Sequence, residues 1–252
     1  MTLACQPLVM LHGWGMNAAV WGGFAERLAA HRQVIPLDLP GHGDRAYAGE
    51  SSLTDWALAC LRAAPPRAIW LGWSLGAEVA QQAALAQPQR VAAVIALTGT
   101  PRFVQAEDWP HAMHAEILQQ FITASREDHR KTLERFLALQ VRGSDRAREV
   151  LRGLRQALAQ RPDPRPAALH AGLQLLKQVD LRDQLPRLGC PTAWLFGERD
   201  TLVPASASAD LARWLPEAER HVIPGAAHAP FLSHEKETLA VLSCLLERFD
   251  AN

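Results

Sequence analysis

The strongest constraint on the fold comes from five residues, Gly72-Trp73-Ser74-Leu75-Gly76, which form a G-x-S-x-G pattern. They follow the apolar run Ala68–Leu71 and lead into the helical pattern Glu78–Leu85. A serine between a strand and a helix adopts a strained backbone conformation, which small residues two positions before and after it permit. The sequence therefore predicts that Ser74 lies on a sharp turn at the carboxyl end of a strand, with its hydroxyl presented for attack.

Apolar runs alternate with helical patterns along much of the chain. The predicted strands cover residues 7–11, 33–38, 68–71, 90–97, 191–197 and 219–223, and further helices are predicted at 20–28, 52–63, 206–215 and 234–249. Continuous apolar strands are typical of a parallel sheet buried on both faces. We therefore predict an α/β fold, a mostly parallel sheet with helices on both faces, whose ligands bind beyond the carboxyl ends of the strands.

The segment from Arg102 to about Val179 departs from this alternation, because it carries helical patterns without a strand. We expect residues 102–179 to form an inserted helical lid subdomain. The core would then consist of residues 1–101 and 180–252. One core with one insertion agrees with a length of 252 residues.

Composition narrows the class of protein. The formal net charge is zero and apolar residues make up 48% of the chain, so overall charge points to no nucleic-acid or membrane partner. No apolar run approaches the length of about eighteen residues needed to cross a bilayer, and no secretion leader is visible. The four cysteines are scattered and are expected to be buried and reduced. We expect a cytoplasmic monomer without a metal or cofactor.

Two later loops offer partners for Ser74. Asp200 follows the strand predicted at 191–197, and His228 follows the last predicted strand. The order Ser, Asp, His, each in the loop after a strand, matches a hydrolytic triad. His228 would take the proton from Ser74, and Asp200 would hold the imidazole in the required tautomer. Three other acids remain open as alternatives to Asp200: Glu198, Asp180 and Asp183.

These segments together resemble the α/β-hydrolase superfamily across the whole chain. The resemblance rests on His12-Gly13, Pro40–Gly43, Gly72–Gly76, Gly197–Asp200 and Gly225–His228. Four stretches are similar, more narrowly, to the family of biotin-pathway carboxylesterases: His12–Gly15, Ile69–Gly76, Glu134–Gln140 and Ala226–Phe231. The resemblance implies an α/β-hydrolase fold and a serine carboxylesterase that hydrolyses the methyl ester of a pimeloyl carrier protein, releasing methanol.

The resemblance also implies a substrate site. Backbone N–H groups of Leu75 and Trp14 would form the oxyanion hole, although Trp14 is also consistent with an aromatic core residue. The residues expected to bind substrate are Trp14, Ser74, Leu75, Phe136, Leu137, Ala138, Leu139, Gln140 and His228.

Basic residues are concentrated in the expected lid. Residues 126–165 hold eleven Lys or Arg against six Asp or Glu in a neutral protein. Four of them form two pairs with a spacing of four, which places each pair on one helix face: Lys131, Arg135, Arg148 and Arg152. The resemblance aligns these four with the residues by which the family binds its acyl-carrier protein, an acidic partner that a positive field would steer. Such rows are also consistent with a solvated helix face.

Two features depart from the family pattern. Ala77 replaces a glycine that commonly follows the serine motif, and we expect its methyl group to be accommodated if the packing opens slightly. Relatives usually carry a short strand before the first apolar run, whereas Met1 to Gln6 is too short for one. We therefore expect a sheet without that edge strand.

The fold and triad alone do not select a substrate. A general short-chain carboxylesterase or a C–C bond hydrolase of the same fold is therefore an alternative interpretation. A small-molecule receptor that uses the triad as a non-catalytic pocket is another. Serine at position 74 excludes the related hydrolases that use an aspartate nucleophile.

Overall fold

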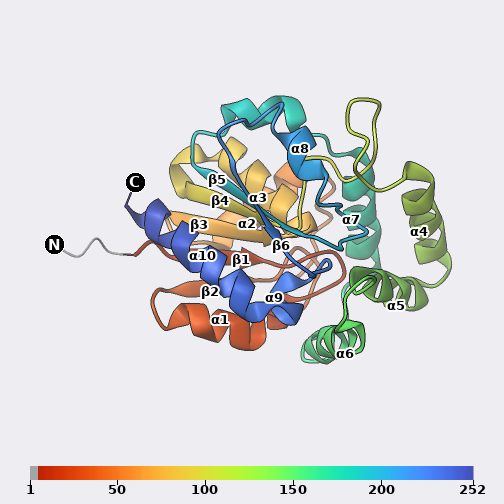
Figure 1. Cartoon of the computed structure of the whole chain (residues 1–252). Helices are drawn as coiled ribbons and strands as arrows, with labels where there is room; N and C mark the ends of the chain where they lie inside the picture. Colours follow the sequence, from red (N-terminus) through yellow and green to blue (C-terminus); the bar gives the residue numbers. More distant parts are fainter. Residues whose placement is uncertain (1–4, 252) are drawn as a thin grey trace.

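The computed structural model describes residues 5–251, which build one six-stranded sheet in the order β2-β1-β3-β4-β5-β6 (Figure 1). Every pairing between neighbouring strands is parallel. The strands are β1 (Leu8–Leu11), β2 (Val34–Leu37), β3 (Ala68–Trp73), β4 (Val91–Leu97), β5 (Thr192–Gly197) and β6 (Glu219–Ile223). β1, β3 and β4 are buried along their whole length, which explains their continuous apolar sequences. The predicted α/β architecture is confirmed.

Helices cover both faces of the sheet. α1 (Gly22–Ala29) and α10 (Glu235–Asp250) lie on one face, and α2 (Leu53–Ala63) and α3 (Leu75–Ala86) lie on the other (Figure 1). Ser52 begins α2 with a capping box, because its hydroxyl accepts the Asp55 N–H at 3.1 Å while the Asp55 carboxylate accepts the Ser52 N–H at 3.0 Å. Short elements complete the core: η1 (Ala18–Trp21), η2 (Pro88–Arg90), η3 (Arg182–Arg187), α8 (Ala207–Leu211) and α9 (Pro230–Ser233).

Four helices lie between β4 and β5 in the chain. They are α4 (Ala115–Glu127), α5 (His129–Gln140), α6 (Ala147–Leu158) and α7 (Pro166–Gln178), and they gather on the right of the sheet in Figure 1. Two isolated β-bridges precede them, Val104 with Met113 and Ala106 with Trp109. Where the segment leaves and rejoins the core, Arg102 and Arg182 bind the Asp180 carboxylate at 2.5 and 2.7 Å. This cluster fixes both ends of the four-helix segment at one place.

Some predictions about helix boundaries and about the burial of the cysteines were wrong. The helix expected at 206–215 ends as α8 at Leu211 and continues as single turns to Leu215, where Pro216 disfavours helix. α9 was not predicted, although Pro230 at its first turn is a typical helix start. Cys60 is buried and Cys190 half-buried, but Cys5 and Cys244 are exposed, against the expectation for all four.

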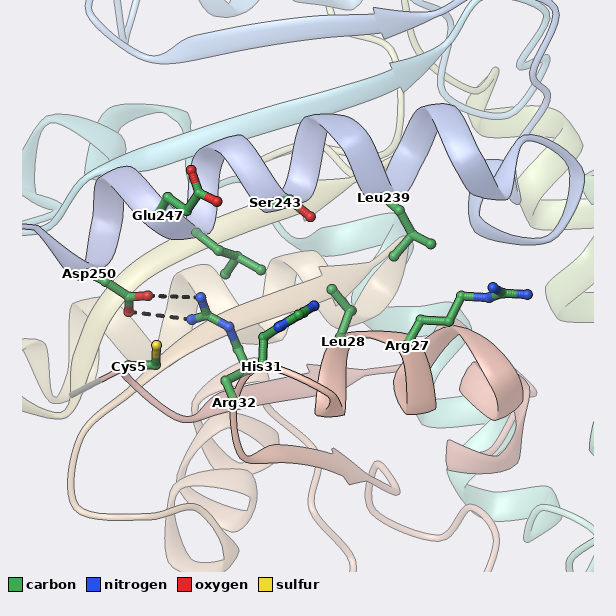
Figure 2. A pocket seen from close by; sticks show the side chains of 10 residues that line it. Cys5, Arg27, Leu28, His31, Arg32, Leu239, Ser243, Glu247 and Asp250 are labelled. Atoms are coloured by element: carbon green, nitrogen blue, oxygen red, sulfur yellow. Dashed lines mark hydrogen bonds and ion pairs between the residues drawn. The ribbon is translucent and has the colours of Figure 1, made fainter. Parts of the chain in front are cut away.

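The two ends of the described range, near Gln6 and Asp250, meet beside α1. Figure 2 shows Arg32 directed at Asp250 in the groove between α1 and α10, with N–O distances of 2.8 and 3.4 Å. Asp250 also accepts the Gln6 N–H at 2.9 Å, and both charged side chains are largely shielded from solvent. The start of the sheet is therefore tied to the last helix.

The expected absence of an N-terminal edge strand concerns mainly residues that the structure does not describe. Residues 1–4 lie outside the described range, and Cys5 and Gln6 belong to no strand. Within residues 5–251, β2 forms the edge of the sheet beside β1. None of the helices in this range is long and apolar enough to cross a membrane.

Glu78 is an acid buried within α3. It is 2% exposed, and its Oε2 atom has no hydrogen-bond partner among the described residues. Burial raises the pKa of Glu78 well above its ordinary value, because the ionised form loses its hydration. Glu78 therefore takes up a proton on folding at a pH where the unfolded chain is ionised.

We predict that Glu78→Gln raises the free energy of unfolding at neutral pH. A group whose pKa is raised by folding stabilises the folded state below its unfolded pKa, here about 4.3, and that contribution is lost as the pH rises. The gain from a permanently neutral amide should therefore be small near that pH and grow toward neutrality in urea denaturation. The exposed Glu26→Gln is the control and should show no such trend. A gain for Glu78→Gln that does not change with pH would contradict ionisation as its cause.

Candidate active site

Ser74 lies at the junction of β3 and α3 in a conformation rare for any residue but glycine. Its φ is 54° and its ψ is −122°. The Ser74 N–H donates to the Leu97 carbonyl on β4 at 3.1 Å, which ties the turn to the neighbouring strand. A β carbon at Gly72 would lie 2.2 Å from the Gly76 carbonyl oxygen, so only glycine allows this close crossing. The structure has the sharp strand-to-helix turn that the motif predicts.

The extra methyl group of Ala77 is accommodated by a glycine across the site. Ala77 is fully buried, and a β carbon at Gly99 would lie 2.3 Å from its Cβ atom. Gly99 follows β4, the strand beside the Ser74 strand. The missing side chain at position 99 therefore provides the space that Ala77 needs.

His228 and Asp200 come from the loops after β6 and β5 and meet directly. Nδ1 of His228 lies 2.7 Å from Oδ2 of Asp200, and both side chains are buried. The other carboxylate oxygen accepts the N–H groups of Leu202 at 2.8 Å and Val203 at 3.0 Å, which fixes its orientation. The Asp200 contact places a proton on Nδ1 and leaves Nε2 as the acceptor that a general base requires.

The reacting atoms themselves carry no partner within residues 5–251. Ser74 Oγ and His228 Nε2 are both buried and neither makes a hydrogen bond there. The ring of Trp73, next to Ser74, lies 5.9 Å from the His228 ring, so the two loops are neighbours. Neither Ser74 Oγ nor His228 Nε2 is therefore occupied by a bond to another part of the described chain, which leaves both available to react. Catalytic hydrogen bonds commonly tighten only when substrate binds.

The alternative acids do not contact His228. Glu198 accepts the Gly225 N–H at 2.7 Å and so shapes the start of the His228 loop. Burial raises the pKa of Asp180, but hydrogen bonds from Arg182 and Arg102 outweigh it and lower that pKa to about 2. Asp183 is exposed at the surface. Asp200 is therefore the acid that the geometry pairs with His228.

Two backbone N–H groups are free near the nucleophile. Leu75 is the first residue of α3, so its N–H has no acceptor within the helix, and the Trp14 N–H donates to no acceptor in the described structure. A β carbon at Gly13 would lie 3.2 Å from the Ser74 Cβ atom, which shows how closely this loop passes the nucleophile. Free N–H groups at this position suit a developing oxyanion.

A neutral imidazole holds the loop that carries Trp14. Burial, reinforced by the neighbouring His42, lowers the pKa of His12 well below its ordinary value. Its Nδ1 donates to the Gly13 carbonyl at 2.8 Å, and its Nε2 accepts the Leu39 N–H at 3.0 Å. Only an uncharged imidazole can make both bonds, so neutral His12 fixes the position of this loop relative to Leu39.

The helices between β4 and β5 pack onto the same loop. Trp14 is fully buried, its Nε1 donates to the Leu169 carbonyl on α7 at 2.8 Å, and its ring meets the edge of Phe136 at 4.8 Å. Trp14 is thus a core aromatic that joins its loop to α5 and α7. Within the expected substrate stretch of α5, Phe136, Leu137 and Gln140 are buried and Leu139 is half-buried. Ala138 is exposed.

Sequence reasoning missed the residues that hold the His228 backbone. The His228 carbonyl accepts Trp73 Nε1–H at 2.7 Å and Thr98 Oγ1–H at 2.8 Å. The His228 N–H donates to the Gln140 carbonyl at the end of α5 at 3.2 Å. Thr98 carried a signal, because it is the first polar residue after the apolar β4 strand, at the edge where Ser74 lies.

The four basic residues singled out in the sequence lie on α5 and α6. Lys131, Arg135, Arg148 and Arg152 are all exposed, and none pairs with an acid among the described residues. Their neighbours Arg130, Arg146 and Arg155 are each paired with one. Arg135 lies over the Phe121 ring at 5.3 Å. The four are therefore exposed positive charges without a paired acid among the described residues, and we call them together the basic face.

The described residues contain no cluster of three or more His, Cys, Asp or Glu able to hold a metal ion. The site brings together a serine hydroxyl, an imidazole paired with a carboxylate, and free backbone N–H groups. This set of groups fits acyl transfer through a covalent intermediate.

Several solved structures share this fold. An esterase from Exiguobacterium antarcticum matches with a TM-score of 0.86 at 20% identity, covering 97% of this chain and 92% of that one. A thermophilic esterase from Thermogutta terrifontis matches with a TM-score of 0.81 at 23% identity, covering 98% and 91%. These likenesses establish the shared fold.

Sequence relatives are closer. The pimeloyl-[acyl-carrier protein] methyl ester esterase of Xanthomonas oryzae pv. oryzae is 44% identical over 245 residues, 97% of this chain and 95% of that protein. The protein of the same name from Klebsiella pneumoniae subsp. pneumoniae is 44% identical over 90% of this chain and 88% of its own length. The sequence also matches the family described as alpha/beta hydrolase fold over residues 6–235. The chain therefore belongs to the α/β-hydrolase family and, within it, to the family of the pimeloyl-[acyl-carrier protein] methyl ester esterases.

Proposed function

We propose that this protein is a serine carboxylesterase that converts the methyl ester of pimeloyl-[acyl-carrier protein] to pimeloyl-[acyl-carrier protein] and methanol, a step of biotin biosynthesis. The observation that carries the substrate is the name shared by relatives 42% to 44% identical over most of both chains. The buried Asp200–His228 pair beside Ser74 supports the ester chemistry. The basic face supports a carrier-bound substrate.

In the acylation step, Ser74 Oγ attacks the carbonyl carbon of the methyl ester. His228 Nε2 takes the serine proton and delivers it to the methoxy oxygen, so that methanol leaves and the pimeloyl group becomes bound to Ser74. Asp200 stabilises the imidazolium through its 2.7 Å contact with Nδ1. The Trp14 and Leu75 N–H groups would bind the negative oxygen, and one such donor is typically worth about 10²- to 10³-fold in rate.

In the deacylation step, the same groups act on water. His228 removes a proton from a water molecule, whose oxygen attacks the acyl carbon. The returned proton restores Ser74, and the free carboxylic acid leaves. No cofactor enters either step, because every proton and bond is supplied by the ester, water and the triad.

The segment 102–179 would act as a helical lid over a core formed by residues 1–101 and 180–252. Its helices α5 and α7 contact the Trp14 loop, so they would form the far wall of the acyl site together with Phe136, Leu137, Leu139 and Gln140. We propose that the protein works as a cytoplasmic monomer, in which the carrier protein reaches the site across the basic face.

Ser74→Ala and His228→Ala should each remove essentially all ester turnover while leaving the thermal unfolding temperature nearly unchanged. The two losses should be similar, because members of one proton-transfer unit do not act additively. Asp200→Asn should lower kcat by roughly 10⁴-fold, since the imidazole would then hold the wrong tautomer. Turnover of a p-nitrophenyl ester measures all three. A folded Ser74→Ala or His228→Ala variant with more than about a tenth of the normal kcat would exclude that residue from the triad.

Reversing the basic face should weaken the reaction with the carrier-bound ester alone. With Lys131, Arg135, Arg148 and Arg152 changed together to Glu, kcat/KM for methyl pimeloyl carrier protein should fall at least about tenfold, through slower association and repulsion. A small uncharged ester should react at nearly the normal rate. Added salt should weaken the wild-type reaction with the carrier substrate, because surface charges are screened over about 10 Å at 0.1 M.

The matched control reverses exposed charges at the other end of the sheet. Arg62, Arg67 and Arg187 lie near the amino ends of β3 and β5 and should tolerate the change to Glu without loss on either substrate. If the basic-face variant kept its full rate on the carrier substrate, the four basic-face residues would be an ordinary solvated surface. A loss of equal size on both substrates would indicate a misfolded lid.

A further inference from the structure

The turn between α5 and α6 contacts both loops that carry the catalytic acid and base. We call residues Gln140–Arg146 the lid clasp. It joins the two helices on which the basic face lies, and α6 also packs against α9, the helix that follows the His228 loop. No part of the clasp belongs to the triad or to the basic face.

One side of the clasp is bound to the Asp200 loop. Gly143 has a φ of 87°, and a β carbon there would lie 2.9 Å from the Arg199 carbonyl oxygen, so the two backbones are in close contact. The Asp145 carboxylate pairs with the Arg199 guanidinium. The Arg199 N–H in turn donates to the Ala226 carbonyl of the His228 loop at 2.8 Å. Arg199, the residue immediately before Asp200, thus links the clasp to both the Asp200 loop and the His228 loop.

The other side of the clasp is bound to the His228 loop. The Gln140 carbonyl accepts the His228 N–H at 3.2 Å, and Arg146 Nη1 donates to the Ser233 carbonyl at 2.7 Å. Glu149 holds the Arg146 side chain with two hydrogen bonds of 2.9 and 2.7 Å. The backbone on each side of the His228 imidazole is therefore held from the lid as well as from the core.

We propose that the lid clasp is a positioning element for the Asp200–His228 pair, with Asp145 and Arg146 as its positioning residues. The proposal rests on the proposed triad and extends it into the lid. His228 moves a proton in both acylation and deacylation, so a displaced base slows turnover whichever step limits it. Small displacements of reacting groups are costly, since an error of about 1 Å can reduce a rate by about 10²-fold.

If the clasp positions the base, substitutions in it should lower kcat while leaving KM nearly unchanged. The double variant Asp145→Ala/Arg146→Ala should lower kcat by about fivefold on a small p-nitrophenyl ester, with KM changed by less than about twofold, because the base moves while the acyl site stays. The carrier-bound ester should lose the same factor. Asp145→Glu/Arg146→Lys keeps both pairing groups and should restore kcat to within about twofold of the wild type.

The control is another exposed ion pair of the lid, Arg130 with Asp163 at 2.8 Å, which contacts neither catalytic loop. Arg130→Ala/Asp163→Ala should leave kcat unchanged on the small ester. If the alanine pair in the clasp prevents folding, Gly143→Ala takes its place with the same expected fall in kcat, because its β carbon presses on the Arg199 carbonyl.

Two results would overturn the proposal. One is a folded clasp variant with normal kcat on the small ester. The other is a loss confined to the carrier substrate, which would make the clasp part of the docking surface. Failure of the proposed function has a different signature, because the wild type would then not hydrolyse methyl pimeloyl carrier protein, while the effect of the clasp variants on kcat would still be measurable with the small ester.

Discussion

The strained backbone of Ser74 is the constraint on which the rest of the site depends. A positive φ at a non-glycine residue costs about 1–3 kcal/mol and persists only where the surroundings enforce it. Here the enforcement comes from the hydrogen bond to Leu97 and from the close crossing of Gly72 and Gly76 between fully buried strands. Gly99 also contributes to this packing, because its lack of a side chain leaves room for Ala77. The sheet is rigid where the nucleophile needs rigidity.

The strand order converts this local turn into a site. β3, β4, β5 and β6 are neighbours in the sheet, so the loops that carry Ser74, Asp200 and His228 open at one edge. Trp73 and Thr98 fix the His228 carbonyl from the core, while Gln140 holds its N–H from the lid. The four-helix segment is therefore more than a cover. It binds the His228 backbone, packs against the Trp14 loop and carries the basic face.

The sequence was most informative where one local conformation demands particular residues. The Gly72–Gly76 turn, the apolar strands and the loops after β5 and β6 all follow from such demands. Contacts between distant residues left little local signal: Trp73 donates to a carbonyl 155 positions away, and Glu198 stayed open as an alternative acid to Asp200 until their loops were placed. Exposure of Cys5 and Cys244 likewise depends on packing at the chain ends. The roles of Trp14, Leu75 and the basic face remain predictions.

The proposal assigns carrier recognition to the basic face and ester chemistry to Ser74, and this separation is the central claim. The most direct measurement offers methyl pimeloyl carrier protein and free methyl pimelate separately and compares their kcat/KM values. Both present the same methyl ester to Ser74 and differ at the other end of the acyl chain, which is a free carboxylate in one and the linkage to the carrier in the other. The basic face predicts a preference for the carrier-bound ester of at least about tenfold, which decreases as salt is added. Equal kcat/KM for the two esters at low salt would contradict the claim and leave a general carboxylesterase.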